Sequence, residues 1–337
     1  MWLNLIREFP TTHVLIDNEV NYLRGLSTIL PLHNKIFRYF SDAQEALTWI
    51  NDKSFEDEKN GVPLACFDKD FSSDFSQMCV EKLHKSVYSE KRFTGISAVL
   101  VDYDMPGLNG IELCRSIKNP HTQKILLTGF LGEREARHAL NKGWIDMFLP
   151  KGEDSAQKIS ELISDADSNY FKNSNCILSA MIVSDMRKRI LASNRFMKFF
   201  KDVYTSSSSV EFHMLSPNGD YLFVDAKGMT TGFSVQDVNR REEHLELARE
   251  LSVSGDILTQ LETGQVLFCH AGEDGLPERK HWKYYVFPAL MVDESAGLIG
   301  TFGREVFSDK AFGISAFQPI FDESIKDAVN FLNGGRF

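Results

Sequence analysis

Short apolar runs alternate with longer amphipathic segments through the first half of the chain. Buried parallel strands are near-continuous apolar runs, and the helices that connect them have one apolar face. One such helix is expected at 41–50, where Ser41 can serve as the N-cap. The pattern predicts an α/β fold with a doubly wound parallel sheet, whose strands lie near 13–16, 35–40, 96–102, 124–127 and 145–150.

Polar side chains of complementary chemistry stand at the ends of four of these runs. Asp17 follows the first run and Asp102 closes the third. Thr128 closes the fourth run and Lys151 follows the last. Any one of them alone also fits an ordinary strand-end turn. Because the carboxyl ends of parallel strands meet at the edge where open α/β sheets bind ligands, their shared placement predicts one polar site.

The order of these motifs resembles the receiver domain of two-component response regulators. That family has an acidic pair, an Asp followed by Met-Pro, a Thr or Ser, and a Lys. The matching residues here are 17–18, Asp102 with Met105-Pro106, Thr128 and Lys151. The resemblance covers about residues 10–165 and implies a flavodoxin-like, CheY-like fold for this half of the chain.

The resemblance also implies which residues bind and react. Asp102 is the phosphoacceptor, and Mg²⁺ is held by Asp102, Asp17, Asn18 and the backbone carbonyl of Asp104. A carboxylate that attacks a phosphoryl group brings two anions together, so a divalent cation has to neutralise them. Asn18 keeps a carbonyl ligand but removes one negative charge from the acidic pair, which lowers the expected metal affinity.

Three residues have implied roles after phosphorylation. Thr128 hydrogen-bonds a phosphoryl oxygen, and Lys151 pairs with the phosphorylated aspartate. The movement of Thr128 leaves space into which Phe148 rotates as the switch residue. The alternative is that Phe148 is an ordinary buried side chain. Asn18, together with Gly152 where the family most often has Pro, leaves a degenerate receiver locked in one state as a further interpretation.

The interval between the acidic pair and the phosphoacceptor position is about twice what a minimal five-stranded receiver needs. We therefore expect an insertion at about 51–95. It contains a charged, turn-rich part at 51–60, an apolar patch at 62–67 and a helical pattern at about 76–90. We interpret it as a helical elaboration, which is either a contact face for a partner or a second copy, or a neutral decoration.

The pattern divides the chain into a receiver at 1–167, a helical linker at 168–209 and an output domain at 210–337. A helix at 154–167 closes the receiver, and apolar residues at three- and four-residue spacing continue into the linker. The linker is either a pair of packing helices or a signalling segment that couples the domains or mediates dimerisation. Its serine-rich end at 205–209 predicts a flexible junction.

The output domain has short strands and two helices, at 238–251 and 315–332. Pro217-Asn218-Gly219 marks a hairpin turn between the first two strands. These features predict an α+β domain with a mostly antiparallel sheet, faintly similar to PAS or small nucleotide-binding modules. The strands lie near 210–215, 221–225, 265–270, 282–288 and 297–302.

Composition and missing motifs narrow the function classes. A formal net charge of −10 and the lack of a helix-turn-helix pattern argue against direct DNA binding. The signature of diguanylate cyclases is missing, since the Gly-Gly pair at 334–335 is followed by Arg336. No apolar run is long enough to span a membrane and no signal peptide is evident, so we expect a cytoplasmic protein without membrane contact.

These features predict a response regulator of a phosphorelay that is not itself an enzyme. Its partner is a cognate sensor histidine kinase or phosphotransfer protein, and phosphorylation of Asp102 changes homodimerisation or partner contacts of a non-DNA-binding output domain. An enlarged receiver with such an output faintly resembles quorum-sensing response regulators. The alternative is a receiver-gated output that binds a nucleotide or another small ligand, as in a cyclase-like enzyme.

Overall fold

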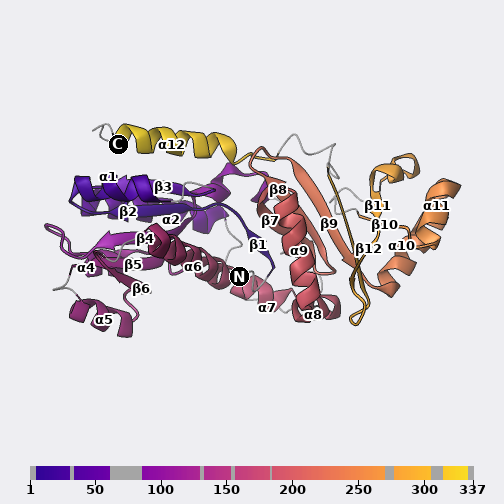
Figure 1. Ribbon diagram of the computed structural model, residues 1–337, viewed down its shortest axis with the longest axis horizontal. Coiled ribbons are helices and arrows are strands. Elements are labelled where there is room, and N and C mark those ends of the chain that lie inside the picture. The colour runs from indigo at the N-terminus through magenta and orange to yellow at the C-terminus, as the bar shows by residue number, and fades with distance from the viewer. Residues whose placement is uncertain are drawn as a thin grey trace.

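The computed structural model describes residues 5–30, 34–60, 86–129, 133–152, 156–182, 184–269, 277–304 and 314–332 of the 337-residue chain. Two large sheets lie one after the other along the long axis of the molecule (Figure 1). A five-stranded sheet comes from the first half of the chain, and a six-stranded sheet comes from the second half with one strand from the N-terminus. No helix in these ranges is long and apolar enough to cross a membrane.

The five-stranded sheet is parallel throughout, with strand order β3-β2-β4-β5-β6. Its central strand β4 is buried along its whole length, as its continuous apolar sequence predicts. The prediction of a flavodoxin-like doubly wound sheet in this half is therefore confirmed. The strands are Thr12–Ile16 (β2), Ile36–Phe40 (β3), Ile96–Asp102 (β4), Gln123–Thr128 (β5) and Met147–Pro150 (β6).

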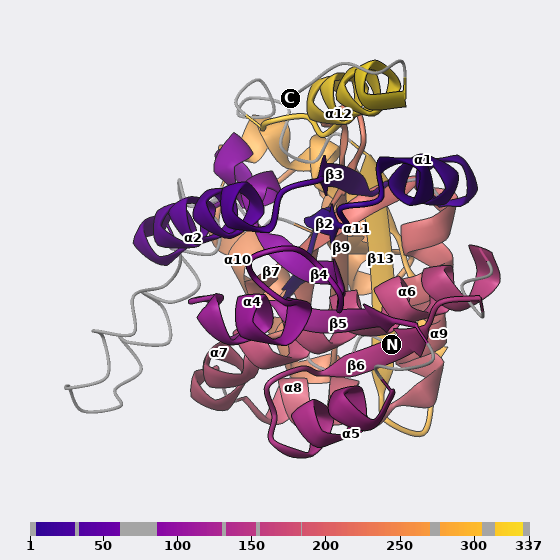
Figure 2. The same cartoon turned by 90° about the vertical axis from the view of Figure 1, so that its left-hand side faces the viewer.

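Helices cover both faces of this sheet (Figure 2). Leu23 of α1 and Ile159 of α6 pack on one face. Ile50 of α2, Leu113 of α4 and Ala139 of α5 pack on the other. The helices are Val20–Ile29 (α1), Ala43–Asn60 (α2), Gly110–Ser116 (α4), Glu133–Asn141 (α5) and Ala156–Ser174 (α6).

The start of the insertion differs from its prediction. Residues 51–60 are not turn-rich but continue α2, because this charged stretch contains no proline or glycine and is rich in glutamate and lysine, which favour helix. The apolar patch at 62–67 and most of the predicted helix at 76–90 lie outside the described residues. The insertion rejoins the sheet through a short 3₁₀ helix, η2 (Glu90–Thr94), directly before β4.

The six-stranded sheet is antiparallel, with strand order β1-β7-β8-β9-β13-β12. A separate two-stranded sheet pairs β10 with β11. A second α+β domain with a mostly antiparallel sheet is thus confirmed. The strands are Arg7–Glu8 (β1), Ser209–Ser216 (β7), Asp220–Asp225 (β8), Thr230–Gln236 (β9), Val266–Phe268 (β10), Val286–Pro288 (β11), Leu290–Asp293 (β12) and Leu298–Arg304 (β13).

Three helices of the predicted linker pack on one face of this antiparallel sheet. Phe196 and Phe200 of α9 lie in one aromatic cluster with Phe233 of β9. Two further helices and a 3₁₀ helix join these three linker helices in the domain. They are Cys176–Met181 (α7), Asp185–Ala192 (α8), Asn194–Ser206 (α9), Val238–Glu250 (α10), Gly255–Glu262 (α11) and Arg279–Tyr284 (η4).

The predicted flexible junction at 205–209 is instead a tight, ordered turn between α9 and β7. Ser207 Oγ lies 2.8 Å from the Val203 carbonyl and 2.6 Å from Ser209 Oγ. Serine side chains often bond nearby backbone in this way, so a serine-rich stretch can end a helix as readily as it can form a linker.

Strand prediction was weakest in the output sheet. β9 was missed because polar residues interrupt its apolar pattern, although Ser234 and Gln236 are buried and bonded to each other. The stretch predicted as a strand at 282–288 begins as the 3₁₀ helix η4, and only its last residues form β11. Trp282 stacks on Phe268 with ring centroids 4.1 Å apart. The apolar residue that suggested a strand is therefore a packing residue of the 3₁₀ helix.

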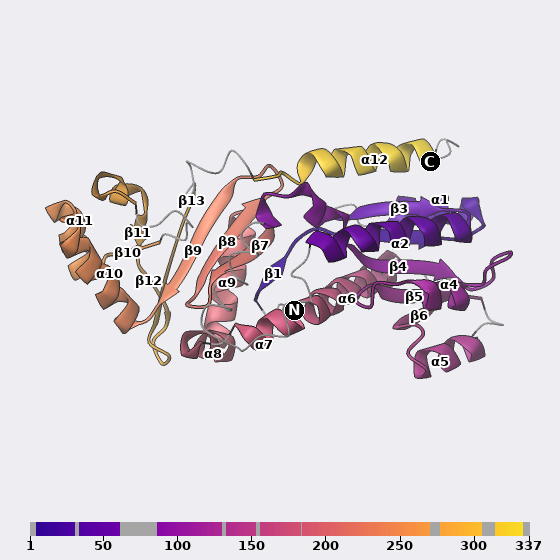
Figure 3. The same ribbon diagram turned by 180° about the vertical axis from the view of Figure 1, so that it is seen from behind.

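Both ends of the described chain cross from one sheet to the other (Figure 3). β1 pairs with β7 in the antiparallel sheet before the chain enters β2 of the parallel sheet. The last helix, α12 (Gln318–Leu332), follows the antiparallel sheet but packs against β3 and α1. Ala328 lies in the same apolar cluster as Leu23 of α1, and Asp327 forms an ion pair with Arg38 of β3.

Candidate functional site

Four strands of the parallel sheet deliver the predicted site residues to one edge. Asp17 directly follows β2, and Asp102 is the last residue of β4. Thr128 is the last residue of β5, and Lys151 directly follows β6. These strands are neighbours in the order β2-β4-β5-β6, so the polar groups face one another across the carboxyl edge, which points away from the antiparallel sheet in Figure 1.

A lysine joins the two acidic strand ends. Lys151 Nζ lies 2.7 Å from Asp17 Oδ2 and 2.8 Å from Asp102 Oδ1. The Asp17 side chain is fully buried, and the Asp102 side chain is 7% exposed. The ring of Tyr22 on α1 adds a cation–π contact, with its centroid 4.4 Å from Lys151 Nζ. One ammonium group therefore bridges two desolvated carboxylates.

The charges of this trio are not balanced. Burial raises the pKa of Asp17, and the nearby negative charge of Asp102 adds to that rise despite the bond from Lys151. Burial acts to lower the pKa of Lys151, but its bonds to Asp102 and Asp17 outweigh this and raise it. Two carboxylates against one cation leave an excess of negative charge, which a further cation at this edge can offset.

The donor set fits Mg²⁺. Asp17 and Asp102 supply carboxylate oxygens, and the exposed Asn18 and Asp104 are adjacent in sequence to these strand ends. No group of three or more His, Cys, Asp or Glu side chains in the described ranges is arranged to hold a metal ion by itself. A cation here thus depends on two carboxylates, carbonyl oxygens and water, which is how Mg²⁺ is commonly bound.

The Thr128 hydroxyl is buried and turned toward its own backbone. Its Oγ1 donates to the Gly129 carbonyl at 2.9 Å, and the Thr128 carbonyl accepts from the Lys151 amide at 2.7 Å. The hydroxyl hydrogen of Thr128 is therefore already used in a bond to the adjacent residue. The adjoining residues 130–132 lie outside the described residues.

Phe148 lies on β6 and is partly buried against the apolar cluster formed with α2, α4 and α5. The guanidinium of Arg137 on α5 lies 5.8 Å from its ring centroid. The side chain is therefore neither locked inside the core nor fully exposed, and it has a cation on its outer side.

Two residues important for the geometry were missed by sequence reasoning. Gly110 begins α4, and a Cβ at this position would stand 2.2 Å from the backbone oxygen of Asp102, so only glycine lets the helix start so close to the site. Tyr22 was not identified, because an aromatic residue on an amphipathic helix normally indicates packing. A signal for Gly110 did exist, namely its place after Met105-Pro106-Gly107 at a helix start.

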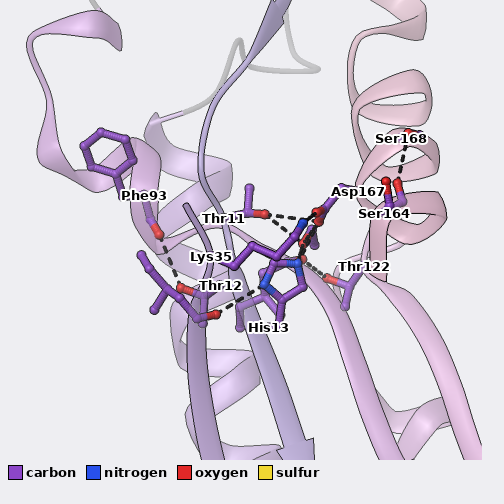
Figure 4. Close-up of polar contacts among 12 residues, drawn as sticks. Thr11, Thr12, His13, Lys35, Phe93, Thr122, Ser164, Asp167 and Ser168 are labelled. Carbon is purple, nitrogen blue, oxygen red and sulfur yellow. Dashed lines mark hydrogen bonds and ion pairs between the residues drawn. The ribbon is translucent and has the colours of Figure 1, made fainter. Parts of the chain in front are cut away.

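A second polar cluster lies at the opposite, amino edge of the same sheet (Figure 4). Asp167 of α6 bonds His13 Nε2 at 2.8 Å, Ser97 Oγ at 2.7 Å and the Lys35 ammonium. Thr11 Oγ1 donates to Ser97 Oγ at 2.8 Å. Bonds from Lys35 and His13 outweigh burial and hold the pKa of Asp167 well below its usual range. We refer to these five residues as the amino-edge cluster.

A scan against known protein families and a search of curated proteins both find no match. Among solved structures, the Legionella pneumophila response regulator LqsR is similar over its full length, with 25% identity and a TM-score of 0.70. The match covers 95% of this chain and 96% of LqsR.

Shorter matches fall on about half of the chain. A response regulator receiver domain protein from Clostridium thermocellum is 21% identical, with 50% of this chain and 98% of that chain covered and a TM-score of 0.32. A CheY-like receiver domain protein from Methanospirillum hungatei is 15% identical, with coverages of 48% and 98% and a TM-score of 0.34. These scores are too low to add to the argument. The doubly wound sheet with its acidic edge, together with the full-length similarity to LqsR, identifies the chain as a response regulator with a CheY-like receiver domain.

Proposed function

We propose that this response regulator is switched by Mg²⁺-dependent phosphorylation of Asp102. The observation that supports this most directly is the bridge of Lys151 Nζ between Asp17 and Asp102 at the carboxyl edge. It supports the proposal because the acceptor carboxylate, a second carboxylate that would bind the metal ion and a cation for the product would then share one small site.

The phosphoryl donor is a phosphohistidine of a sensor kinase or phosphotransfer protein. An Asp102 carboxylate oxygen attacks phosphorus, the new P–O bond forms, and the P–N bond to histidine breaks. Asp17, Asn18, Asp102 and the Asp104 carbonyl would hold Mg²⁺, which neutralises charge between the two anions. Lys151 releases Asp102 and pairs with a phosphoryl oxygen while it keeps its bond to Asp17.

The switch consists of Thr128 and Phe148. Phosphorylation draws the Thr128 hydroxyl from the Gly129 carbonyl to a phosphoryl oxygen, and Phe148 turns inward into the space that is released. Support for this comes from the two starting positions, since Thr128 is buried beside the site and Phe148 is only partly buried.

The output does not bind DNA and is not an enzyme; phosphorylation changes homodimerisation or contacts with a protein partner. The net charge of −10 supports the first point, since a phosphate backbone repels such a surface. The full-length similarity to LqsR supports a shared use of the whole layout, receiver at 1–167, helices at 168–209 and output at 210–337. We extend this to a role in quorum-sensing control.

The test is intact mass combined with size-exclusion light scattering, before and after incubation with Mg²⁺ and acetyl phosphate. We expect one adduct of about 80 Da in the parent, none in Asp102→Asn, and a change of oligomeric state that accompanies the adduct. Asp104→Asn is the matched control, because it alters a neighbouring exposed carboxylate but keeps the backbone carbonyl. An adduct that persists in Asp102→Asn, or its absence from the parent, would overturn the proposal.

A further inference from the structure

One buried arginine lies where the receiver meets the output domain. Arg92 is on η2, and its guanidinium binds Glu211 of β7 at two points, with Nε and Nη2 each 2.8 Å from a carboxylate oxygen. Its Nη1 donates to the Val87 and Ser89 carbonyls at 2.8 Å, and Nη2 also donates to the Ser315 carbonyl at 2.6 Å. Arg92 thus joins the end of the insertion, the output sheet and the segment that leads into α12.

This ion pair is shielded from solvent and closed by a third side chain. The Arg92 and Glu211 side chains are 2% and 0% exposed. His213 Nε2 lies 3.0 Å from Glu211 Oε2, and burial lowers the pKa of His213, so the ring is neutral and donates this bond. Removing a partner from a desolvated pair leaves a buried charge uncompensated, so the pair resists separation of the two domains.

The same output strand also anchors the N-terminal segment. β1 pairs with β7 in the register Arg7 to His213 and Glu8 to Phe212. The Met214 amide adds a bond to the Ile6 carbonyl at 2.7 Å. After β1 the chain passes directly into β2, whose end presents Asp17.

Two neighbouring strands of the receiver, β2 and β4, are therefore attached to the output domain in the same way. β2 and β4 carry Asp17 and Asp102 at their carboxyl ends, and both are fixed to β7 just before their amino ends. A strand of this length spans about 15–25 Å as a single hydrogen-bonded unit, because each residue advances about 3.3 Å. The reactive edge and the output sheet are thus joined by the strands themselves, as Figures 1 and 3 show.

An apolar cluster surrounds this junction and makes it a packed interface rather than a tether. Side chains from both parts of the chain contribute to it. The ring centroids of Phe93 and Phe317, for example, lie 5.4 Å apart. Packed interfaces have discrete arrangements and do not deform continuously, so a shift on one side has to be matched on the other. Its buried members are Phe9, Ile36, Phe93, Tyr170, Phe171, Val210 and Phe317.

The amino-edge cluster adds a link to α6 (Figure 4). The Asp167 carboxylate bonds His13 of β2, Ser97 of β4 and Lys35, which directly precedes β3. A relative movement of these strands therefore reaches α6, which leads into the helices that pack on the output sheet.

We propose that the state of Asp102 is transmitted to the output domain through β2 and β4 into β7, and that the Arg92–Glu211 pair is the joint of this route. This inference rests on the proposed phosphorylation of Asp102. Arg92 and Glu211 are positioning residues, since neither reaches the site at the carboxyl edge.

The test is amide hydrogen exchange of 209–216 in the full chain, with and without Mg²⁺ and acetyl phosphate, with intact mass measured on the same samples. In the parent, we expect the adduct to change exchange of these amides several-fold. Glu211→Gln, which keeps the shape but removes the charge, and Arg92→Lys, which keeps the charge but loses the two-point bond, form the adduct to the same extent and lose the exchange response. Arg189→Gln is the control, because its ion pair with Asp237 lies wholly within the output domain, and it keeps the response.

The mass readout separates failure of this route from failure of phosphorylation. An adduct in the parent without an exchange response at 209–216, or an undiminished response in both joint variants, overturns the route. A second measurement needs no phosphate: Asp17→Asn changes exchange at 209–216 in the parent background but not in Glu211→Gln. Distant residues without a shared route behave additively, so additivity of these two substitutions also overturns the proposal.

Discussion

The two edges of the parallel sheet hold buried ion clusters that look alike but are opposite in electrostatic character. At the carboxyl edge, Asp17 is bonded to Lys151, yet burial and the charge of Asp102 raise its pKa. At the amino edge, Asp167 is bonded to Lys35 and His13, and these bonds lower its pKa in spite of burial. A buried carboxylate that several donors bond has its charge compensated and contributes to stability. A buried carboxylate whose charge is not fully compensated favours the binding of a further cation.

The same electrostatic difference separates the carboxyl edge, which we propose to react, from the contacts that we propose to transmit the change to the output domain. At the carboxyl edge, one ammonium group bonds two carboxylates, and our proposal requires Lys151 to exchange one of them for a phosphoryl oxygen. The amino edge and the Arg92–Glu211 pair are fully bonded, and the pKa of Glu211 is lowered because Arg92 and His213 outweigh burial. One end of each strand is therefore electrostatically labile and the other is fixed, which suits a strand that reports a change at one end to a neighbour at the other.

Asp167→Ala is the substitution with the largest expected effect on stability. It leaves the buried His13 and the partly exposed Lys35 without their shared carboxylate. Because the Asp167 side chain is 16% exposed, we expect a cost below the about 3–5 kcal/mol typical of breaking a fully buried ion pair. Urea denaturation monitored by circular dichroism measures the loss. Asp327→Ala, which breaks the more exposed pair with Arg38, is the control and should cost far less. Equal losses in the two variants would show that the amino-edge cluster contributes no more to stability than the partly exposed Arg38–Asp327 pair.

The pH dependence of stability follows from the same shifts. Asp167 and Glu211 have lowered pKa values, so their contributions are complete above the unfolded values of about 4 and are lost as pH falls further toward the folded values. We expect the urea midpoint to fall steeply below about pH 4 in the parent. Asp167→Asn should flatten this slope, and an unchanged slope would assign acid sensitivity to other groups.

Asp17→Asn tests a carboxylate whose pKa is shifted in the opposite direction, upward. The pKa of Asp17 is raised, so its protonated form is favoured on folding, and that stabilisation is lost as pH rises through the folded value. At pH 7 the amide removes this unfavourable buried charge, and we expect the free energy of unfolding to rise. Intact mass on the same variant should show less adduct, since the proposed Mg²⁺ site loses the negative charge of one carboxylate. A destabilised variant would mean that the Lys151 bond outweighs burial after all.

Of the two edges, only the carboxyl edge could be predicted from the sequence. Asp17, Asp102, Thr128 and Lys151 each end an apolar run, and the parallel topology that those runs predict is enough to bring them together. The amino-edge cluster had no such signal, because Asp167 comes from a helix face and Ser97 is a polar residue inside an apolar strand.

The contacts between the domains were likewise beyond sequence reasoning. Glu211 and His213 alternate along β7 with Phe212 and Met214 of the apolar core, and such alternation predicts that the polar side chains face solvent. Their burial follows from the packing of a second domain and of Arg92, and no local pattern in one strand can report a partner more than a hundred residues away.

Substitutions of Tyr22 have the smallest expected effect and test the contacts of Lys151 at the carboxyl edge. Its ring stands 4.4 Å from Lys151 Nζ, and a cation–π contact of this kind is worth about 0.5–1 kcal/mol, or about two- to fivefold in a rate. Tyr22→Phe keeps the ring and should form the adduct at the parent rate, whereas Tyr22→Leu keeps an apolar side chain but removes the ring and should slow adduct formation by that factor. Stopped samples analysed by intact mass give the rates. If leucine and phenylalanine behave alike, the two carboxylates alone position Lys151, and its freedom to change partners is greater than the aromatic contact suggests.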